Sequence, residues 1–364
     1  MPSDIPSLSY GSADVGGDDR FRPAEISASN LTPGTLASLT GAGFQVIRSN
    51  DTGALGAGLA ARLRTPRDLA PNPAIQLARQ IAPNAVFDFS HIYGPSVGAE
   101  TYARAMVNMP ARGRCVASGT IGLIDTRVVD HPALDEARIE QRSFSESRPS
   151  GLHGTAVASI IAGDHPDGPS LIGDARLLVA NVFSVEERTL VADAIDLVAA
   201  LGWMIEGGAR VVNMSLAGPP NDLVADAVAR GAEQGLIIVA AAGNGGRRAG
   251  PRYPAAYEEV IATAAVDARG RPYRLNSSGD HIDVAAPGVD VWGADSRNDG
   301  GALWSGTSFA APLVTAEVAA AYDQGLVRTV EEARAFLAGN ARDLGKRGRD
   351  PDFGAGLLQI VACR

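Results

Sequence analysis

The chain has 364 residues, of which 45% are hydrophobic, so it can bury a large core and hold one big domain plus a small one. Its net charge is −9, and no basic run or basic stripe with aromatic residues occurs, which excludes the usual pattern of a nucleic-acid-binding protein. No window approaches about 18 uninterrupted apolar residues, and the first residues lack the basic and apolar regions of a signal peptide. We therefore expect no membrane segment, and a targeting segment is either absent or already removed. The two cysteines, Cys115 and Cys363, are either two buried thiols or one bridge.

Residues 1–39 are rich in Ser, Gly, Pro and Asp and show no apolar periodicity, which predicts a flexible leader. From residue 40 the pattern changes. GFQVIRS and ARLRTP are typical of strands, PAIQLARQI is typical of a helix, and NAVFDFSHIY alternates like a strand. The sequence thus predicts a small α+β unit over residues 40–93.

Residues 94–364 form a third predicted segment, in which apolar strands alternate with longer helices. The strand candidates are TIGLID, RLLVANV, ARVVNMSL, LIIVAAA and VIATAAV. Short continuous apolar strands separated by helices indicate an α/β fold, with a parallel sheet covered by helices on both faces. In such sheets, active residues gather at the carboxyl ends of the strands.

Three polar residues stand at the edges of these predicted elements. Asp125 ends TIGLID, His153 opens the small-residue helix HGTAVASIIAG, and Ser308 opens the helix SFAAPLVTAEVAAAY. Taken singly, each residue is better explained by a structural role than by a catalytic one. These roles are a cap or turn for Asp125, a packed histidine for His153 and an N-cap for Ser308. Together they form an Asp, His and Ser set within one parallel core.

Such a set has a known chemical use. A serine hydroxyl needs an imidazole to take its proton, and the imidazole needs a carboxylate to fix its tautomer and stabilise its charge. The carbonyl that the serine attacks becomes an oxyanion, which the backbone N–H of Ser308 at a helix start could stabilise. Asn244 follows a buried strand between Gly243 and Gly245, where its side-chain amide could supply a second donor; the alternative is a left-handed turn residue.

The blocks around these residues resemble those of the subtilisin-like serine proteases, the subtilases. The matching blocks are GLIDT, HGTAVAS, NMSL, AAAGN and GTSFAAP, in the family's order. The resemblance implies that Asp125 orients His153, that His153 is the general base and acid, and that Ser308 is the nucleophile. It implies Asn244 as the oxyanion donor, and a substrate-binding segment made of Ser215, Leu216, Ala217 and Gly243.

Few positions depart from the family pattern. Ala217 stands where the family often has glycine, and Phe309 where methionine is commoner. Arg252 falls near the position that lines the family's primary specificity pocket, where it could favour an acidic or polar residue before the cut; a solvated surface arginine is the alternative. No cofactor is required by this resemblance. Calcium is possible at DSRNDGG (295–301) or DHPDG (164–168), although surface turns explain both stretches as well.

The resemblance also gives the small unit over residues 40–93 a role. Subtilases commonly carry a prodomain that chaperones folding and then occupies the active site as an intramolecular inhibitor. We therefore expect a zymogen that cleaves itself between Tyr93 and Gly94, with an uncleaved accessory domain as the alternative. The expected activity is that of a serine endopeptidase acting on protein or peptide substrates, secreted or periplasmic as the family implies. A catalytically silent subtilase relative used for binding is the alternative, and a nucleotide-binding protein is disfavoured by the absence of a phosphate loop.

Overall fold

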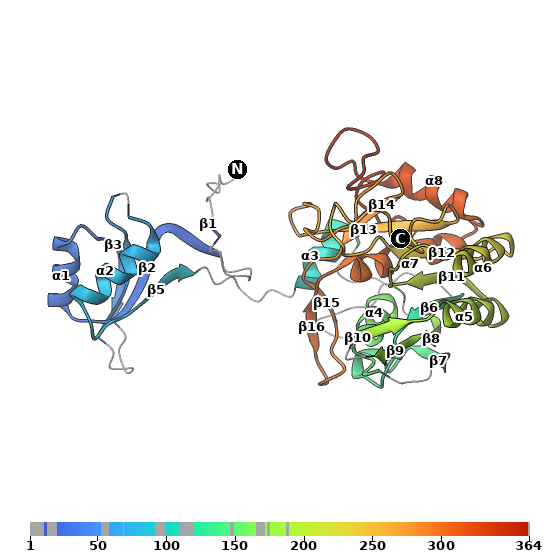
Figure 1. Cartoon of the computed structure of the whole chain (residues 1–364), viewed down its shortest axis with the longest axis horizontal. Helices are drawn as coiled ribbons and strands as arrows, with labels where there is room; N and C mark the ends of the chain where they lie inside the picture. Colours follow the sequence, from blue (N-terminus) through green and yellow to red (C-terminus); the bar gives the residue numbers. More distant parts are fainter. Residues whose placement is uncertain are drawn as a thin grey trace. The chain divides into compact units, whose positions relative to one another are not determined.

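The computed structural model describes residues 11–12, 20–51, 58–67, 69–91, 99–109, 119–145, 149–164, 172, 175–186 and 189–362. The chain divides into two compact units, residues 1–96 and 97–364, which we call the N-terminal unit and the C-terminal unit (Figure 1). Each is described by itself. Cys115, Cys363 and the expected processing site between Tyr93 and Gly94 lie outside the described residues.

The N-terminal unit is an antiparallel sheet with two helices. The strand order is β1-β2-β4-β3, and β5 also pairs with β2. The strands are β1 (Gly11–Ser12), β2 (Arg20–Leu31), β3 (Gln45–Asp51), β4 (Leu59–Arg64) and β5 (Val86–His91), and the helices are α1 (Pro33–Gly41) and α2 (Pro71–Ile81). The four elements predicted from residue 43 onward are confirmed as β3, β4, α2 and β5.

The prediction of a flexible leader over residues 1–39 is wrong for residues 20–39, which form β2 and most of α1. Ile26 and Leu31 of β2 are fully buried in the core of this unit. The helix α1 begins after Thr32, whose hydroxyl accepts a hydrogen bond from the backbone N–H of Thr35, as in a capping box. The small unit therefore starts well before residue 40, because β2 is the strand on which β4 and β5 pair.

The C-terminal unit is built on a seven-stranded sheet whose neighbouring strands are all parallel, in the order β14-β13-β12-β11-β6-β8-β7. The strands are β6 (Thr120–Asp125), β7 (Arg138–Ser143), β8 (Arg176–Asn181), β11 (Ala209–Met214), β12 (Ile237–Ala241), β13 (Val260–Val266) and β14 (Val284–Pro287). The predicted parallel α/β sheet is confirmed.

Helices cover both faces of this sheet, because successive strand residues point to opposite sides. Leu177 and Val179 join one buried cluster, whereas Leu178 and Ala180 join the other. On the first face lie α3 (Ala99–Met106), α4 (Leu152–Ala162), α7 (Thr307–Asp323) and α8 (Val330–Asn340), and on the second lie α5 (Ala194–Glu206) and α6 (Asp222–Glu233).

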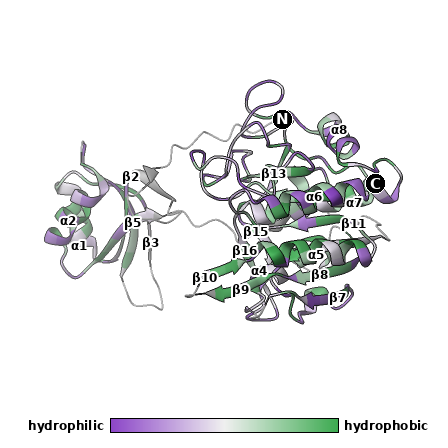
Figure 2. Cartoon of the chain, turned by 45° about the vertical axis from the view of Figure 1, so that its right-hand side comes forward, coloured by the Kyte–Doolittle hydropathy of each residue, from purple (hydrophilic) through white to green (hydrophobic). Residues whose placement is uncertain are grey.

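Shorter elements surround the sheet. They are a 3₁₀ turn, η2 (Pro132–Leu134), and two antiparallel hairpins formed by β9 (Phe183–Glu186) with β10 (Thr189–Ala192) and by β15 (Val291–Ala294) with β16 (Gly301–Trp304). Figure 2 shows the edge strand β7 in purple and the helix α5 in green, which agrees with the polar sequence RIEQRS of β7. Within the described part of the chain, no helix combines the length and apolar character needed to cross a bilayer.

Candidate active site

The predicted site residues follow the carboxyl ends of neighbouring strands. Asp125 is the last residue of β6, Ser215 follows β11 directly, and Asn244 comes three residues after the end of β12. Because β6, β11 and β12 are adjacent and parallel, these residues meet at one edge of the sheet. The starts of α4 and α7 bring His153 and Ser308 to the region, and the rings of His153 and Phe309 lie 5.3 Å apart between centroids.

Asp125 and His153 form a closely bonded pair. Nδ1 of His153 lies 2.7 Å from Oδ1 and 2.9 Å from Oδ2 of Asp125, whose side chain is fully buried. A carboxylate only accepts hydrogen bonds, so Nδ1 carries the proton and Nε2 is left as the basic nitrogen. The His153 side chain is 29% exposed, which leaves part of the ring open to an incoming molecule.

The start of α4 is fixed to the loop after β6 by a backbone contact that only glycine permits. The backbone N–H of Gly154 donates to the hydroxyl of Thr126 at 2.8 Å. A Cβ on Gly154 would lie 2.3 Å from the carbonyl oxygen of Thr126, well inside contact distance. The glycine after His153 therefore brings the helix start close enough for the imidazole to reach Asp125.

The pKa of His153 is set by two opposing effects. Burial disfavours the charged imidazolium, whereas the charge of Asp125 and the hydrogen bond that its carboxylate accepts from Nδ1 favour it. The two contributions from Asp125 together prevail, and the pKa of His153 is raised above its ordinary value of 6.5. The imidazole can therefore take up a proton more readily than a free histidine.

Ser308 is the second residue of α7, and only 9% of its surface is exposed. Its hydroxyl donates to the carbonyl oxygen of Ser215 at 3.2 Å, and no hydrogen bond joins it to His153 among the described residues. The backbone N–H of Ser308 lies in the first turn of α7, where N–H groups have no acceptor within the helix.

The backbone carbonyl of Ser308 has an unusual partner. Residue 312 would normally donate to it within the helix, but Pro312 has no N–H. The hydroxyl of Ser215 donates to this carbonyl instead, at 2.8 Å, and in turn accepts from the side-chain amide of Asn213 at 2.8 Å. The hydroxyl of Thr315 bonds Asn213 Oδ1 at 3.0 Å. A buried polar chain thus joins α7 to β11 beneath Ser308.

Asn244 is held so that its amide nitrogen is available. Its Oδ1 accepts from the backbone N–H of Thr307 at 3.0 Å and from the Thr307 hydroxyl at 3.1 Å. Since both are donors, Oδ1 must face Thr307, and Nδ2 points away from it as a donor. The Thr307 hydroxyl also accepts from the backbone N–H of Gly243 at 3.1 Å. This role of Thr307 was not predicted from the sequence.

A cleft of about 320 Å³ connects these groups. It is lined by Ser215, Leu216, Ala217, Ala241, Gly243, Asn244, Gly245, Arg252, Thr307 and Ser308. All four predicted substrate-binding residues belong to this lining, together with Asn244 and Ser308. The exposure rises from buried Ser215 to exposed Ala217, so the segment leads from the buried region near Ser308 outward to the surface.

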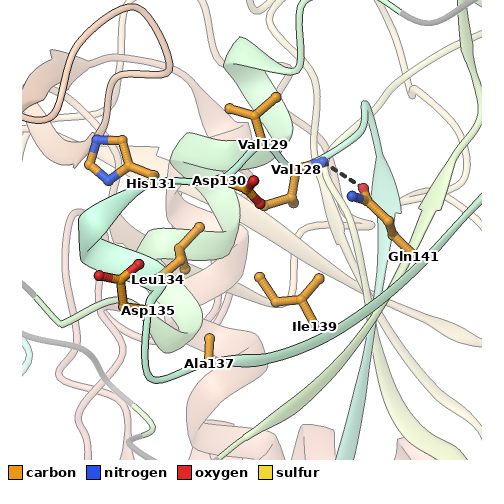
Figure 3. A pocket seen from close by; sticks show the side chains of 9 residues that line it. All are labelled: Val128, Val129, Asp130, His131, Leu134, Asp135, Ala137, Ile139 and Gln141. Carbon is orange, nitrogen blue, oxygen red and sulfur yellow. Dashed lines mark hydrogen bonds between the residues drawn. The ribbon is translucent and has the colours of Figure 1, made fainter.

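A second cleft, of about 330 Å³, lies beside the loop after β6 (Figure 3). His131 belongs to its lining, but both ring nitrogens of His131 are engaged: Nδ1 accepts from the backbone N–H of Ala133 at 3.0 Å, and Nε2 pairs with the carbonyl of Gly300 at 2.8 Å. Gln141 across the cleft accepts from the backbone N–H of Val128. These hydrogen bonds hold the loop after β6 against its neighbours. They account for a histidine at position 131 without a ligand-binding role.

Of the two calcium candidates, DSRNDGG lies within the described residues, whereas most of DHPDG lies outside them. The Asp295 carboxylate accepts two hydrogen bonds from the Arg297 guanidinium, at 2.8 and 2.7 Å, which lower the pKa of Asp295. The amide oxygen of Asn298 accepts from the backbone N–H of Gly300. No group of three or more His, Cys, Asp or Glu suited to a metal occurs in the described ranges.

Comparison with known proteins gives a consistent result. Residues 118–356 match the model of the Subtilase family. The chain is 33% identical to the minor extracellular protease Epr of Bacillus subtilis (strain 168) over 66% of its length, and 30% identical to fervidolysin of Fervidobacterium pennivorans over 82% of its length. It spans 38% and 48% of these relatives, less than half of either. The C-terminal unit makes up less than three quarters of the chain, so the fervidolysin match extends into the N-terminal unit.

One solved structure adds to this. The self-cleaved protease domain of PatA is similar at a TM-score of 0.57 and 27% identity, over 68% of this chain and 96% of that one.

Proposed function

The chain belongs to the subtilase family, and we propose that it is a serine endopeptidase that hydrolyses peptide bonds through an acyl-enzyme. One observation carries this proposal. The same cleft brings together the hydroxyl of Ser308 and the amide of Asn244, beside an imidazole whose Nδ1 is bound by the buried Asp125. This arrangement supplies a nucleophile, a base and an oxyanion donor.

In the proposed acylation, Nε2 of His153 takes the proton of the Ser308 hydroxyl as Oγ attacks the substrate carbonyl. The negative oxygen that forms is stabilised by Nδ2 of Asn244 and by the backbone N–H of Ser308. His153 then gives its proton to the leaving amine, and the C–N bond breaks. Asp125 accepts the hydrogen bond from Nδ1 throughout and stabilises the imidazolium.

Deacylation repeats these steps with water. Nε2 of His153 takes a proton from the water, whose oxygen attacks the acyl carbon, and the same donors hold the oxyanion. The Ser308 oxygen leaves and regains its proton from His153. The exposed end of the segment Ser215–Ala217 offers backbone groups to an extended peptide, which would add as a neighbouring strand.

Two substitutions test the mechanism. Ser308→Ala should abolish peptide hydrolysis without unfolding the protein, because a small residue replaces a small one at a helix start. Asn244→Ala should lower kcat by roughly 10²–10³ with little change in KM, because its amide acts in the transition state. Initial rates on a fluorogenic peptide and circular dichroism of both variants measure these effects. Hydrolysis by Ser308→Ala at the wild-type rate, in a protease-free preparation, would exclude this nucleophile. No hydrolysis by the folded, processed wild type would support the catalytically silent alternative.

We further propose that the N-terminal unit is a prodomain, removed by self-cleavage between Tyr93 and Gly94. Two observations support this: the fervidolysin match extends into the unit, and β5 ends at His91, two residues before the proposed cut. The PatA protease domain is described as self-cleaved, and an extracellular relative favours a secreted or periplasmic location. Purified wild type should show a new N-terminus at or within a few residues of Gly94, and Ser308→Ala should stay full length. A wild-type chain that hydrolyses peptides but stays intact would contradict the processing proposal alone.

A further inference from the structure

Among the described residues, a single charged side chain lines the cleft beside Ser308. Its walls are otherwise backbone, small side chains, Leu216 and Asn244, and Arg252 alone among the lining residues carries a charge. The cleft lies between the segment after β11 and the loop after β12, next to the two groups that would hold the scissile carbonyl. The side chain of the substrate residue that precedes the scissile bond, called P1 here, would enter this space.

Arg252 reaches along the wall of the cleft because two glycines make room for it. A Cβ on Gly243 would lie 3.0 Å from Cγ and 3.1 Å from Cβ of Arg252, so only glycine leaves this passage open. A Cβ on Gly245 would lie 3.6 Å from Nε and 3.7 Å from Nη2, which places the guanidinium beside this second glycine. The charged group therefore lies at the cleft and is partly buried rather than fully solvated.

The Arg252 guanidinium has no acidic partner among the described residues, whereas a neighbouring arginine of the same loop does. Arg247 lies 2.9 Å from Asp352. A guanidinium presents paired N–H donors that match a carboxylate, and a charge-assisted pair is stronger in a partly desolvated site. An arginine without an acidic partner, in a cleft whose other lining residues are uncharged, thus favours an anionic substrate side chain.

We propose that Arg252 selects substrates with glutamate or aspartate at P1, an inference that rests on the proposed peptidase function. The guanidinium pairs with the P1 carboxylate while the P1 carbonyl lies between Ser308 and Asn244. This makes Arg252 a specificity-determining residue and acidic peptides the substrate class. Cleavage after Tyr93 is compatible with this preference, because a tethered segment has a high effective concentration and does not need the best-fitting P1 side chain.

The test uses internally quenched peptides that differ only at P1, with Glu, Gln, Leu or Lys. Gln is the matched comparison, since it has nearly the shape of Glu without the charge. For the processed wild type we expect kcat/KM for Glu to exceed that for Gln by about 10- to 100-fold, with Lys poorest, and the preference to fall at high salt. Arg252→Gln should bring the Glu and Gln rates together, and Arg252→Glu should reverse the order of Glu and Lys.

Arg248→Gln is the control variant. It makes the same charge change in the same loop, but Arg248 is exposed and does not line the cleft, so the Glu preference should persist. Equal wild-type rates for Glu and Gln, or a Glu preference that survives Arg252→Gln, would overturn the proposal. The Ser308→Ala protein, freed of its N-terminal unit by an engineered cleavage site, separates this inference from the peptidase function. Its affinity for the uncleaved peptides should show the same Glu preference, whether or not the wild type cleaves them, and equal affinities for Glu and Gln would refute it.

Discussion

Thr307 is expected to act on catalysis through Asn244, and the substitution Thr307→Val tests this. Valine keeps the shape of the side chain but lacks the hydroxyl. The change removes the bond from Thr307 Oγ1 to Asn244 Oδ1 and leaves the backbone N–H of Gly243 without its acceptor. The backbone N–H of Thr307 still binds Asn244 Oδ1 at 3.0 Å, so the amide keeps one of its two anchors.

The size of the effect follows from these bonds. Thr307 is fully buried and Gly243 is buried, so the unpaired N–H should cost about 1–3 kcal/mol of unfolding free energy. Complete loss of an oxyanion donor costs roughly 10²–10³ in kcat, a magnitude that comes from subtilisin itself. With one anchor kept, we expect Thr307→Val to lower kcat by about tenfold and to leave KM almost unchanged.

A double-mutant cycle with Asn244→Ala separates an effect on the position of the Asn244 amide from a general loss of structure at the site. If Thr307 acts through Asn244, then Thr307→Val should cause little further loss of kcat once Asn244 is alanine. Steady-state kinetics of the four proteins, with thermal unfolding of each, give the coupling. A full tenfold loss in the Asn244→Ala background, or wild-type kcat in Thr307→Val, would refute the positioning role.

The remaining predictions concern pH, the buried polar chain and metal dependence. Nε2 of His153 must be neutral to act as a base, and the pKa of His153 is raised, so kcat/KM should rise with pH through a midpoint above 6.5. A pH–rate profile with a midpoint below 6.5 would contradict the pairing of His153 with Asp125. Ser215→Ala should lower the unfolding free energy by about 1–3 kcal/mol, because it leaves the Ser308 carbonyl unpaired. The loss should be smaller in a Pro312→Ala background, where the new N–H of residue 312 can bond that carbonyl. Equal losses in the two backgrounds, measured by chemical denaturation, would exclude this account. Treatment with a chelator should leave peptide hydrolysis unchanged, since Asp295 already pairs with Arg297, and a loss that calcium restores would contradict this.

Much of the sheet could be predicted from the sequence because its strands are buried on both faces. TIGLID and VIATAAV are continuous apolar runs, and they form β6 and β13. The edge strand β7, RIEQRS, has one neighbour and is mostly exposed, so its sequence carries no apolar signal. The strand β2 was not predicted for a different reason: Pro23 and two serines interrupt its apolar residues, and it becomes a strand through pairing with β4 and β5.

The site residues were predictable where motif and strand end coincide, as at Asp125. Their supporting partners were not, because these contacts join residues far apart in the chain. The bond between Thr307 and Asn244 spans 63 residues, and that between Ser215 and Ser308 spans 93. The use of Ser215 as a substitute donor depends on Pro312 lying inside α7.

The central claim is that Ser308 is a nucleophile activated by His153. The most direct test is reaction with a fluorophosphonate probe, followed by mass spectrometry of the labelled peptide. The account predicts one adduct, on Ser308, that forms in the processed wild type and is lost in His153→Ala. A folded, processed wild-type sample that takes up no probe, or takes it up at another residue, would contradict it.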